Sequence, residues 1–286
     1  MEKITFLGPV GATFSHDAYS VLAETYGAPK INEENCIPAN SNNEILKLIL
    51  EHGGYGAIAM ETLAGARVAE PVESFIDLLE KYKKIEDCPI HVVGAIRLKL
   101  HFCLMARLDC SSIAKILAHP KALEACKGRI KKIGIPTMGV ASNGERARLV
   151  AEDDNNADHA ALGPKSASEK YRLKVLEEEF EDKKAVTTFF LIAPVRHEKK
   201  IGKENRALIT FKIPHRPGAL IKALQPFDLM DLNLIQIHSI HSGNLNYNFA
   251  IEIPVRPEEL KRFNLAMKLF QEQVDEHLLF GPFEII

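Results

Sequence analysis

The residues that suggest chemistry begin with two threonines at the start of an apolar run. Thr187 and Thr188 open the segment Ala185–Ala193, where β-branched and aromatic residues predominate up to Pro194. Such a run predicts a buried strand. A hydroxyl held at the end of a strand can donate a proton or a hydrogen bond into a cleft. The alternative is that both threonines are present only because threonine forms strands well.

A glycine-containing segment near the start of the chain could bind an anion. Gly8-Pro9-Val10-Gly11 follows a predicted strand at residues 3–7. We expect the strand to resume at residues 12–16, where a helix starts with Ser15 as its N-cap. A strand, a glycine loop and a helix start often present backbone N–H groups to an anion. The alternative is that these glycines are ordinary turn residues.

Two further polar pairs lie at the ends of predicted elements. Glu61 and Thr62 follow a predicted strand at residues 55–60, and ligands bind at the carboxyl ends of strands in open α/β sheets. Ser142-Asn143-Gly144-Glu145 is a capping box that opens a helix. The N-terminus of that helix would attract an anion. The alternative is that Ser142 is an N-cap and nothing more.

The elements that would position these residues alternate between strands and helices, which indicates an α/β architecture with largely parallel sheets. A capping box at Ser41–Glu44 opens a helix that ends at Gly53-Gly54. Pro71 suits the first turn of another helix, with Val72, Phe75, Ile76 and Leu79 as its buried stripe. The later elements are expected as strands at 91–96, 98–104 and 116–118, a helix ending at Gly128, a strand at 159–162 and a helix from Gly163-Pro164.

A change of composition near Ile90, reversed near Leu162, predicts two lobes. We expect a catalytic domain over residues 1–194. Its lobe 1 would hold about residues 1–88 and 163–194, and its lobe 2 about residues 89–162. A two-lobed α/β unit binds its ligand in the cleft between the lobes.

The last part of the chain predicts a separate small domain. Residues 195–205 are charged and almost without apolar side chains, and we expect a linker there. Residues 206–286 follow a βαββαβ pattern, which predicts a ferredoxin-like α+β fold. The expected elements are strands at 208–213, 234–240, 246–253 and 283–286, a helix beginning at 217 and a helix at 257–274.

Composition narrows the class of protein. Of the 286 residues, 46% are apolar and 26% charged, as in ordinary globular proteins. The net charge of −2 gives no reason to expect nucleic acid or an anionic membrane as partner. We see no signal peptide and no transmembrane segment. Five cysteines without a C-x-x-C pair indicate free thiols in a reducing cytoplasm. His238 and His241 would point to opposite faces of a strand, which argues against a shared metal.

Several of these motifs, taken in order, resemble the prephenate dehydratase family. They are Phe6–Ser15, Ala118–Cys126, Ala160–Gly163 and the threonine strand. The C-terminal part resembles the ACT regulatory domain of that family, because Arg216–Ile221 matches its Gly-Ala-Leu-Val signature. The resemblance implies a bilobed catalytic domain of periplasmic-binding-protein type, an ACT domain, and a homodimer or homotetramer.

The chain departs from the family pattern at four places. The Thr-Arg-Phe motif of the family reads Thr187-Thr188-Phe189 here, so the arginine is missing. The Glu-Asn-Thr/Ser motif reads Glu61-Thr62-Leu63, with a longer loop after it, and a Ser-Thr pair reads Ser142-Asn143. In the ACT domain, Glu-Ser-Arg-Pro falls on residues 238–241, and only Ser239 is retained.

The resemblance implies the decarboxylating dehydration of prephenate to phenylpyruvate in L-phenylalanine biosynthesis, with Thr187 donating the proton. It needs no metal and no organic cofactor, because aromatisation drives the reaction. The residues expected to bind the dianionic substrate are Gly11, Thr13, Ser15, Glu61, Thr62, Ser142, Asn143, Gly163, Thr188 and Phe189. Those expected to bind an amino-acid effector are Pro217, Gly218, Ala219, Leu220, His238 and Ser239.

The missing arginine leaves other functions open. An arginine would bind a carboxylate bidentately, and losing it costs on the order of a few kcal/mol unless another cation replaces it. Arg67, Arg97 and Arg146 are the candidates for that cation. Otherwise the chain would be a divergent enzyme that decarboxylates prephenate without aromatising it, or a non-catalytic sensor of a small ligand.

Overall fold

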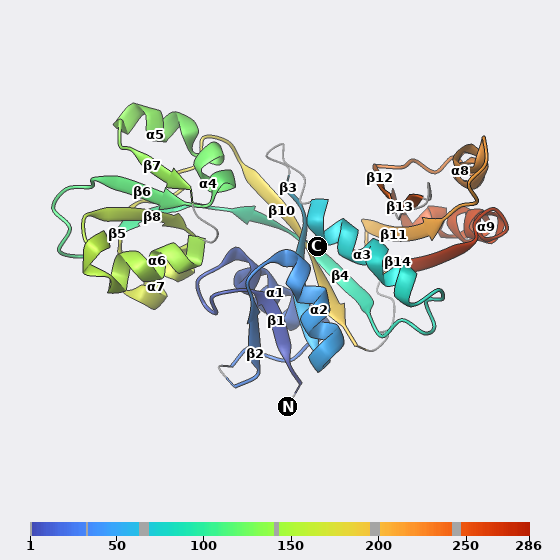
Figure 1. Ribbon diagram of the computed structural model, residues 1–286, viewed down its shortest axis with the longest axis horizontal. Coiled ribbons are helices and arrows are strands. Elements are labelled where there is room, and N and C mark those ends of the chain that lie inside the picture. Colours follow the sequence, from blue (N-terminus) through green and yellow to red (C-terminus); the bar gives the residue numbers. More distant parts are fainter. Residues whose placement is uncertain (1, 33, 63–68, 140–142, 195–200, 242–246) are drawn as a thin grey trace. The chain divides into compact units, whose positions relative to one another are not determined.

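The structure of the chain is a computed structural model, shown in Figure 1. It describes residues 2–32, 34–62, 69–139, 143–194, 201–241 and 247–286, with only the backbone described at 61, 62, 69, 70 and 143. Within these described residues the fold is mixed α/β and contains three sheets, of five, five and four strands. This agrees with the fold class expected from the sequence.

The first sheet has the strand order β2-β1-β3-β10-β4. Strand β1 runs parallel to both β2 and β3, as expected where helices connect successive strands. The threonine strand β10 has the bounds predicted for it. The elements are β1 Ile4–Leu7, α1 Phe14–Tyr26, β2 Cys36–Ala39, α2 Asn42–His52, β3 Tyr55–Thr62, β4 His91–Leu100 and β10 Ala185–Ala193.

Helix α1 begins earlier than predicted. Its N-cap is Thr13, not Ser15, and no strand resumes at residues 12–16. The Thr13 hydroxyl donates to the Leu7 carbonyl (2.7 Å) and accepts from the His16 amide (3.2 Å). The chain turns at Gly11, whose φ of +72° lies in the left-handed region that glycine adopts readily. A threonine bonded back to the end of β1 ends the extended segment and starts the helix at once.

The second sheet has the order β7-β6-β8-β5-β9. Strand β6 is parallel to β7 and β8, while β5 is antiparallel to β8 and β9. Its core includes Met105, Leu117, Ala147, Val150 and Ala161. The elements are β5 Cys103–Ala106, β6 Lys115–Ala118, α4 Pro120–Ala125, α5 Lys127–Ile133, β7 Thr137–Gly139, α6 Asn143–Glu152, a 3-10 turn Asp154–Asn156, β8 His159–Gly163, α7 Lys165–Tyr171 and β9 Lys174–Glu177.

Two boundaries in this region were predicted wrongly. The helix expected to end at Gly128 is two short helices, and Gly128 lies inside α5, which ends at Gly134. Asp182 accepts from the backbone amides of Gly128 and Arg129. A carboxylate from far along the chain therefore caps the start of α5, where unpaired amides need an acceptor. The predicted strand 98–104 is also divided, between β4 and β5.

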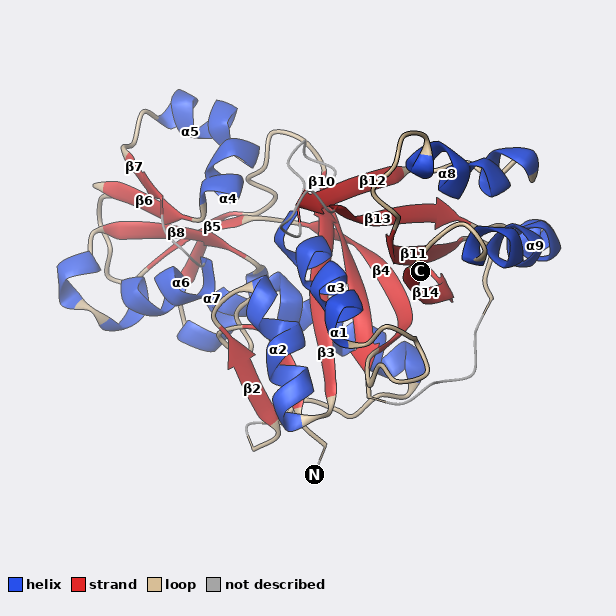
Figure 2. Cartoon of the chain, turned by 45° about the vertical axis from the view of Figure 1, so that its right-hand side comes forward, coloured by secondary structure: helices blue, strands red, loops and turns tan. Residues whose placement is uncertain are grey.

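The third sheet confirms the βαββαβ pattern and is antiparallel, with the order β12-β13-β11-β14. Helices α8 and α9 lie together on one face, as Figure 2 shows, over a core that includes Phe211, Phe227, Ile251, Phe263 and Phe270. The elements are β11 Asn205–Lys212, α8 Ala219–Leu229, β12 Gln236–His241, β13 Tyr247–Pro254, a 3-10 turn Pro257–Glu259, α9 Leu260–Gln271 and β14 Glu276–Glu284.

Helix α3 (Ala69–Lys81) packs on the same third sheet and contacts all four of its strands. Its predicted stripe of Val72, Phe75, Ile76 and Leu79 is buried. The chain divides into one compact unit of Met1–Val68 with Arg97–Phe189, and another of Ala69–Ile96 with Phe190–Ile286. By its contacts α3 thus belongs with the C-terminal sheet. None of the helices in the described part of the chain is both long and apolar enough to cross a membrane.

Candidate functional site

Thr187 and Thr188 are both buried near the start of β10, with exposed fractions of 3% and 2%. Neighbouring side chains in a strand point to opposite faces of the sheet. Phe189 therefore shares a face with Thr187, and Thr188 faces the other way. An arginine at position 188 would also project from the face opposite Thr187. The change from arginine to threonine at position 188 therefore lies on the face of β10 opposite the Thr187 hydroxyl.

Residues of the glycine loop and the turn after it form hydrogen bonds that stabilise the fold, in addition to the binding role predicted for them. The Gly8 amide donates to the Ala39 carbonyl (2.9 Å), which fixes the loop against the end of β2. Thr13 is 6% exposed, and its hydroxyl is occupied by the two bonds that cap α1. Ser15 is buried in the first turn of α1. The His16 amide is bound by Thr13, and the amides of Phe14 and Ser15 have no acceptor within the helix, which suits those two to an anion.

The N-terminus of α6 packs directly against the glycine loop. A Cβ added at Gly144 would lie 2.6 Å from Pro9 Cδ and 2.7 Å from the Ala12 carbonyl oxygen. Such an approach is possible only for glycine. The start of α6, predicted as one anion site, thus lies beside the loop predicted as another. Ser142 is outside the described residues, and Asn143 begins α6.

One basic side chain contacts the glycine loop, and two more belong to α6. Lys170 of α7 donates from its ammonium to the Val10 carbonyl, and its Cδ would lie 3.2 Å from a Cβ added at Gly11. Arg146, in the first turn of α6, is half-buried. Its neighbour Arg148 is held by Glu145 (2.7 Å) and Glu152 (2.8 Å). Those hydrogen bonds from Arg148 lower the pKa of the Glu145 carboxyl.

The remaining predicted substrate residues are distributed over the first and the second sheet. Glu61 and Thr62 are the last residues of β3, and their side chains lie outside what is described. Gly163 ends β8 and pairs with Cys103 of the second sheet. Arg97 is half-buried in β4, and Arg67 lies outside the described residues. The described residues contain no cluster of three or more His, Cys, Asp or Glu side chains placed to hold a metal.

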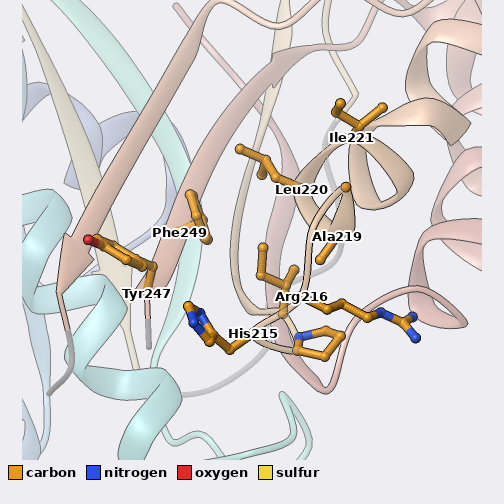
Figure 3. Close-up of a pocket in the computed structure, with 10 residues that line it drawn as sticks. His215, Arg216, Ala219, Leu220, Ile221, Tyr247 and Phe249 are labelled. Carbon is orange, nitrogen blue, oxygen red and sulfur yellow. The ribbon is translucent and has the colours of Figure 1, made fainter. Parts of the chain in front are cut away.

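A second candidate site is a hollow of about 320 Å³ on the third sheet. Figure 3 shows Tyr247 and Phe249 on one side of it and the chain around Ala219 and Leu220 on the other. Gly218, at φ +76°, starts α8 there. The lining residues are Ile213, Pro214, His215, Arg216, Gly218, Ala219, Leu220, Ile221, Tyr247 and Phe249.

The predicted effector residues divide between this hollow and other places. Gly218, Ala219 and Leu220 line it, and Pro217 is the residue between two of its lining positions. Ser239 pairs with Phe249 across β12 and β13, so it lies on the same face of the sheet as the hollow. His238 lies on the opposite face, with its Nε2 3.8 Å from Glu73 of α3.

Comparison with known proteins assigns the family. Residues 4–197 match the family described as prephenate dehydratase, which is more than half of the chain. The chain belongs to the prephenate dehydratase family. A prephenate dehydratase of Methanocaldococcus jannaschii is 30% identical over 216 residues, covering 74% of this chain and 75% of the relative. Against several longer relatives, the alignment spans about half of their length.

Solved structures agree on the fold. The prephenate dehydratase of Arthrobacter aurescens, solved in complex with L-Phe, has a TM-score of 0.78 and 21% identity, covering 98% of this chain and 88% of that one. A protein described as GqqA, a novel type of quorum quenching acylase, has a TM-score of 0.74 and 18% identity, covering 98% and 97%. Proteins with different described activities therefore share this fold, and the family assignment rests on the sequence match.

Sequence reasoning missed two residues of the candidate site, Gly144 and Lys170. Gly144 is the third residue of the predicted capping box, where glycine is a poor helix former. That mismatch was the signal, because a glycine in a helix start implies a close neighbour. Lys170 is 160 residues from the carbonyl it contacts, and no pattern along the chain could have indicated the contact.

Proposed function

We propose that this chain converts prephenate to phenylpyruvate, carbon dioxide and water, as a lyase of phenylalanine biosynthesis. The observation that carries the proposal is the family match over residues 4–197, within which the threonine strand is retained with Thr187 buried. The bond from the ring to its carboxylate breaks and its electron pair enters the ring. The ring C–O bond breaks as well, and the hydroxyl leaves as water.

Thr187 would donate the proton that the departing hydroxyl requires, and solvent would return a proton to it. The reaction therefore takes up one proton overall. The two carboxylates of prephenate need positive partners, and the adjacent N-termini of α1 and α6 supply backbone amides and positive dipole ends. Gly11, Thr13, Ser15 and Asn143 belong to these two starts.

We infer that Arg146 provides the missing cation. It is in the first turn of α6, two residues from the glycine that touches the glycine loop, and it is half-buried. Arg148 is less suited because Glu145 and Glu152 already bind its guanidinium. A guanidinium beside two helix N-termini would bind a carboxylate with two hydrogen bonds.

The test is turnover of prephenate by the purified full chain, with products identified by mass and ultraviolet absorbance. We expect phenylpyruvate, and a loss of about 10²–10⁴-fold in kcat for Thr187→Val with a smaller loss for Thr187→Ser, which keeps the hydroxyl. A non-aromatic decarboxylated product would instead favour the divergent decarboxylase, which the change at Thr188 makes a second candidate. Prephenate that binds without being converted would favour the third alternative, a non-catalytic sensor of a small ligand.

The C-terminal unit would act as an ACT regulatory domain that binds an amino acid. The hollow has apolar walls with His215, Arg216 and Tyr247 as its polar groups, and a relative with the same fold is described in complex with L-Phe. Apolar walls with a few polar groups suit a small amphiphilic ligand. Calorimetric titration with L-phenylalanine tests this, and a heat signal unchanged by Tyr247→Ala would argue against the hollow as its site.

Assembly and location complete the proposal. Strand β12 is at an edge of the third sheet and exposes Ile237 at 45%. An exposed edge with an apolar side chain is a template for pairing with another copy, which supports a homodimer or homotetramer. All five cysteines are free thiols, which supports a reducing cytoplasm.

A further inference from the structure

Helix α3 covers the third sheet with two chemically different halves. Over β14 the contact is aromatic, because Phe75 meets Phe280 edge to face with ring centres 5.0 Å apart. Phe190 of β10 joins this group through Phe75 (6.5 Å) and Phe283 (4.7 Å). Over β12 and β13 the contact is polar. The two halves differ in how readily water can replace the contact.

The polar half is formed by an acidic stripe on the helix. Glu73, Asp77 and Glu80 are spaced along one face of α3. The Asn248 amide donates to Glu80 (2.8 Å), and His238 lies 3.8 Å from Glu73. Burial first, and then the charges of Glu80 and Glu73, raise the pKa of the Asp77 carboxyl between them. Three neighbouring carboxyl groups repel one another where they are partly removed from water.

The sheet beneath this stripe is incompletely bonded. Thr210 Oγ1, Gln236 Nε2 and Asn248 Oδ1 are buried and have no hydrogen-bond partner among the residues that the structure describes. Thr210 and Asn248 are only 0% and 2% exposed. Buried polar atoms without partners favour any arrangement that hydrates them. The polar half therefore stabilises the closed contact less than the aromatic half does.

This contact is one residue away from the hollow and continuous along the chain with the catalytic strands. Phe249 lines the hollow, while its neighbour Asn248 bonds α3 on the other face of β13. Helix α3 follows β3, which ends at the predicted site residues Glu61 and Thr62. Phe190 follows Thr187 in β10. A small movement of β13 would therefore displace the face of the sheet on which α3 and Phe190 of β10 pack.

We propose that the contact of Glu80 and Glu73 with Asn248 and His238 is a separable clasp through which ligand in the hollow controls the prephenate site. This inference rests on the proposed function, because it takes the hollow as the effector site and the prephenate site as the site that the effector controls. The aromatic half stays packed, and the polar half closes or opens with the position of β13. Asn248 and Glu80 are positioning residues, since neither touches substrate.

The test compares Asn248→Asp with the double variant Asn248→Asp/Glu80→Gln in the full chain. Asn248→Asp sets a carboxylate against Glu80 and should open the polar half. In the double variant the glutamine amide donates to the new carboxylate and should close it again. Lys83→Gln is the matched control, because Lys83 pairs with Glu276 (3.6 Å) beyond the end of α3 without touching the clasp.

Two readouts are needed. Hydrogen exchange of residues 69–81 should rise in Asn248→Asp and return in the double variant. The concentration of L-phenylalanine that half-inhibits or half-activates prephenate turnover should shift by about fivefold or more, the usual lower range of allosteric coupling, and return as well. Glu80→Ala alone, which removes the acceptor of the Asn248 amide, should shift both in the same direction as Asn248→Asp, which covers the case that Asn248→Asp fails to fold.

Each outcome decides a separate point. Unchanged exchange in α3 overturns the clasp, and so does changed exchange with an unchanged L-phenylalanine response. If L-phenylalanine does not bind at all, the effector part of the proposed function fails, and the clasp then stands or falls on whether Asn248→Asp alters kcat or KM for prephenate. Absence of prephenate turnover in the unmodified chain sinks the proposed function, and the clasp is then judged by whether L-phenylalanine binding alters α3 exchange.

Discussion

At the scale of single residues, the pair Thr187 and Thr188 shows how a motif change can be tolerated. The threonine expected to act as proton donor is retained, while the position that has lost its arginine faces the other side of β10. A residue lost from the opposite face can be replaced by a cation that approaches from another element. Arg146 is the proposed cation, and it lies in the first turn of α6, whose start packs on the glycine loop.

If Arg146 binds a substrate carboxylate, Arg146→Gln should raise KM for prephenate by about 10–100-fold, the value of a charged hydrogen bond. Arg148→Gln is the matched control on the same helix, because that guanidinium is already bound by Glu145 and Glu152. Steady-state kinetics with prephenate provide the measurement. Equal effects of the two substitutions would contradict the role given to Arg146.

His277 predicts a pH dependence of stability. Burial lowers its pKa below the ordinary value, so the unfolded chain takes up this proton at higher pH than the folded chain does. The stability it contributes is present above about pH 6.5 and is lost as the pH falls towards the lower folded-state pKa. Urea unfolding at about pH 7.5 and pH 5.5 should therefore show a smaller loss for His277→Gln than for the unmodified chain. His52→Gln, at an exposed site, should leave the loss unchanged, and an equal loss in His277→Gln would refute the prediction.

At the scale of elements, helix starts decide the candidate site. Helix α1 begins at Thr13 because that hydroxyl bonds the end of β1, and α6 begins where a glycine permits contact with Pro9 and Ala12. The site is thus made by how two helices begin. The positions of these starts depend on short-range bonds and on one close backbone approach.

Gly144→Ala tests the importance of that approach. Its Cβ would overlap Pro9 and the Ala12 carbonyl oxygen, so the free energy of unfolding should fall by about 1–3 kcal/mol, and kcat/KM for prephenate should fall as the helix start moves. Gly139→Ala is the control, because its Cβ would meet only Pro120 Cγ, at an ordinary 3.5 Å. Thermal unfolding and kinetics of both variants are the measurement. A Gly144→Ala protein with unchanged stability would show that the contact is loose.

At the scale of the whole molecule, the C-terminal unit is completed by chain that precedes it by more than a hundred residues. Helix α3 and the first part of β4, up to Ile96, belong to that unit, with Ala95 bridging Ile285. Phe280 and Phe283 are 2% exposed, and both belong to the aromatic group that also includes Phe75 and Phe190. The third sheet therefore shares an aromatic core with α3 and with Phe190, which follows Thr187 in β10.

A fragment of residues 201–286 should consequently be poorly folded on its own. Without α3, one face of its sheet exposes Phe280 and Phe283 together with buried polar groups such as Glu252, and an exposed apolar patch binds other apolar surfaces. We expect binding of a hydrophobic dye and a non-cooperative thermal transition, whereas the full chain unfolds cooperatively. A fragment with a sharp transition and no dye binding would show that α3 is dispensable to the sheet.

The sequence by itself determined most of the elements and the family. Local patterns such as the apolar run at 185–193, the capping box at Ser41 and the stripe of α3 depend on residues close in the chain, and the structure has them as predicted. Tertiary structure alone decided which distant residues meet. Asp182 caps the start of α5, where the sequence predicted that a single helix would end. Gly144 touches the glycine loop, and His238 faces Glu73 on the side of the sheet opposite the hollow. The physical reason is that propensity and periodicity act over a few residues, whereas close approach and ion pairing depend on packing across the fold.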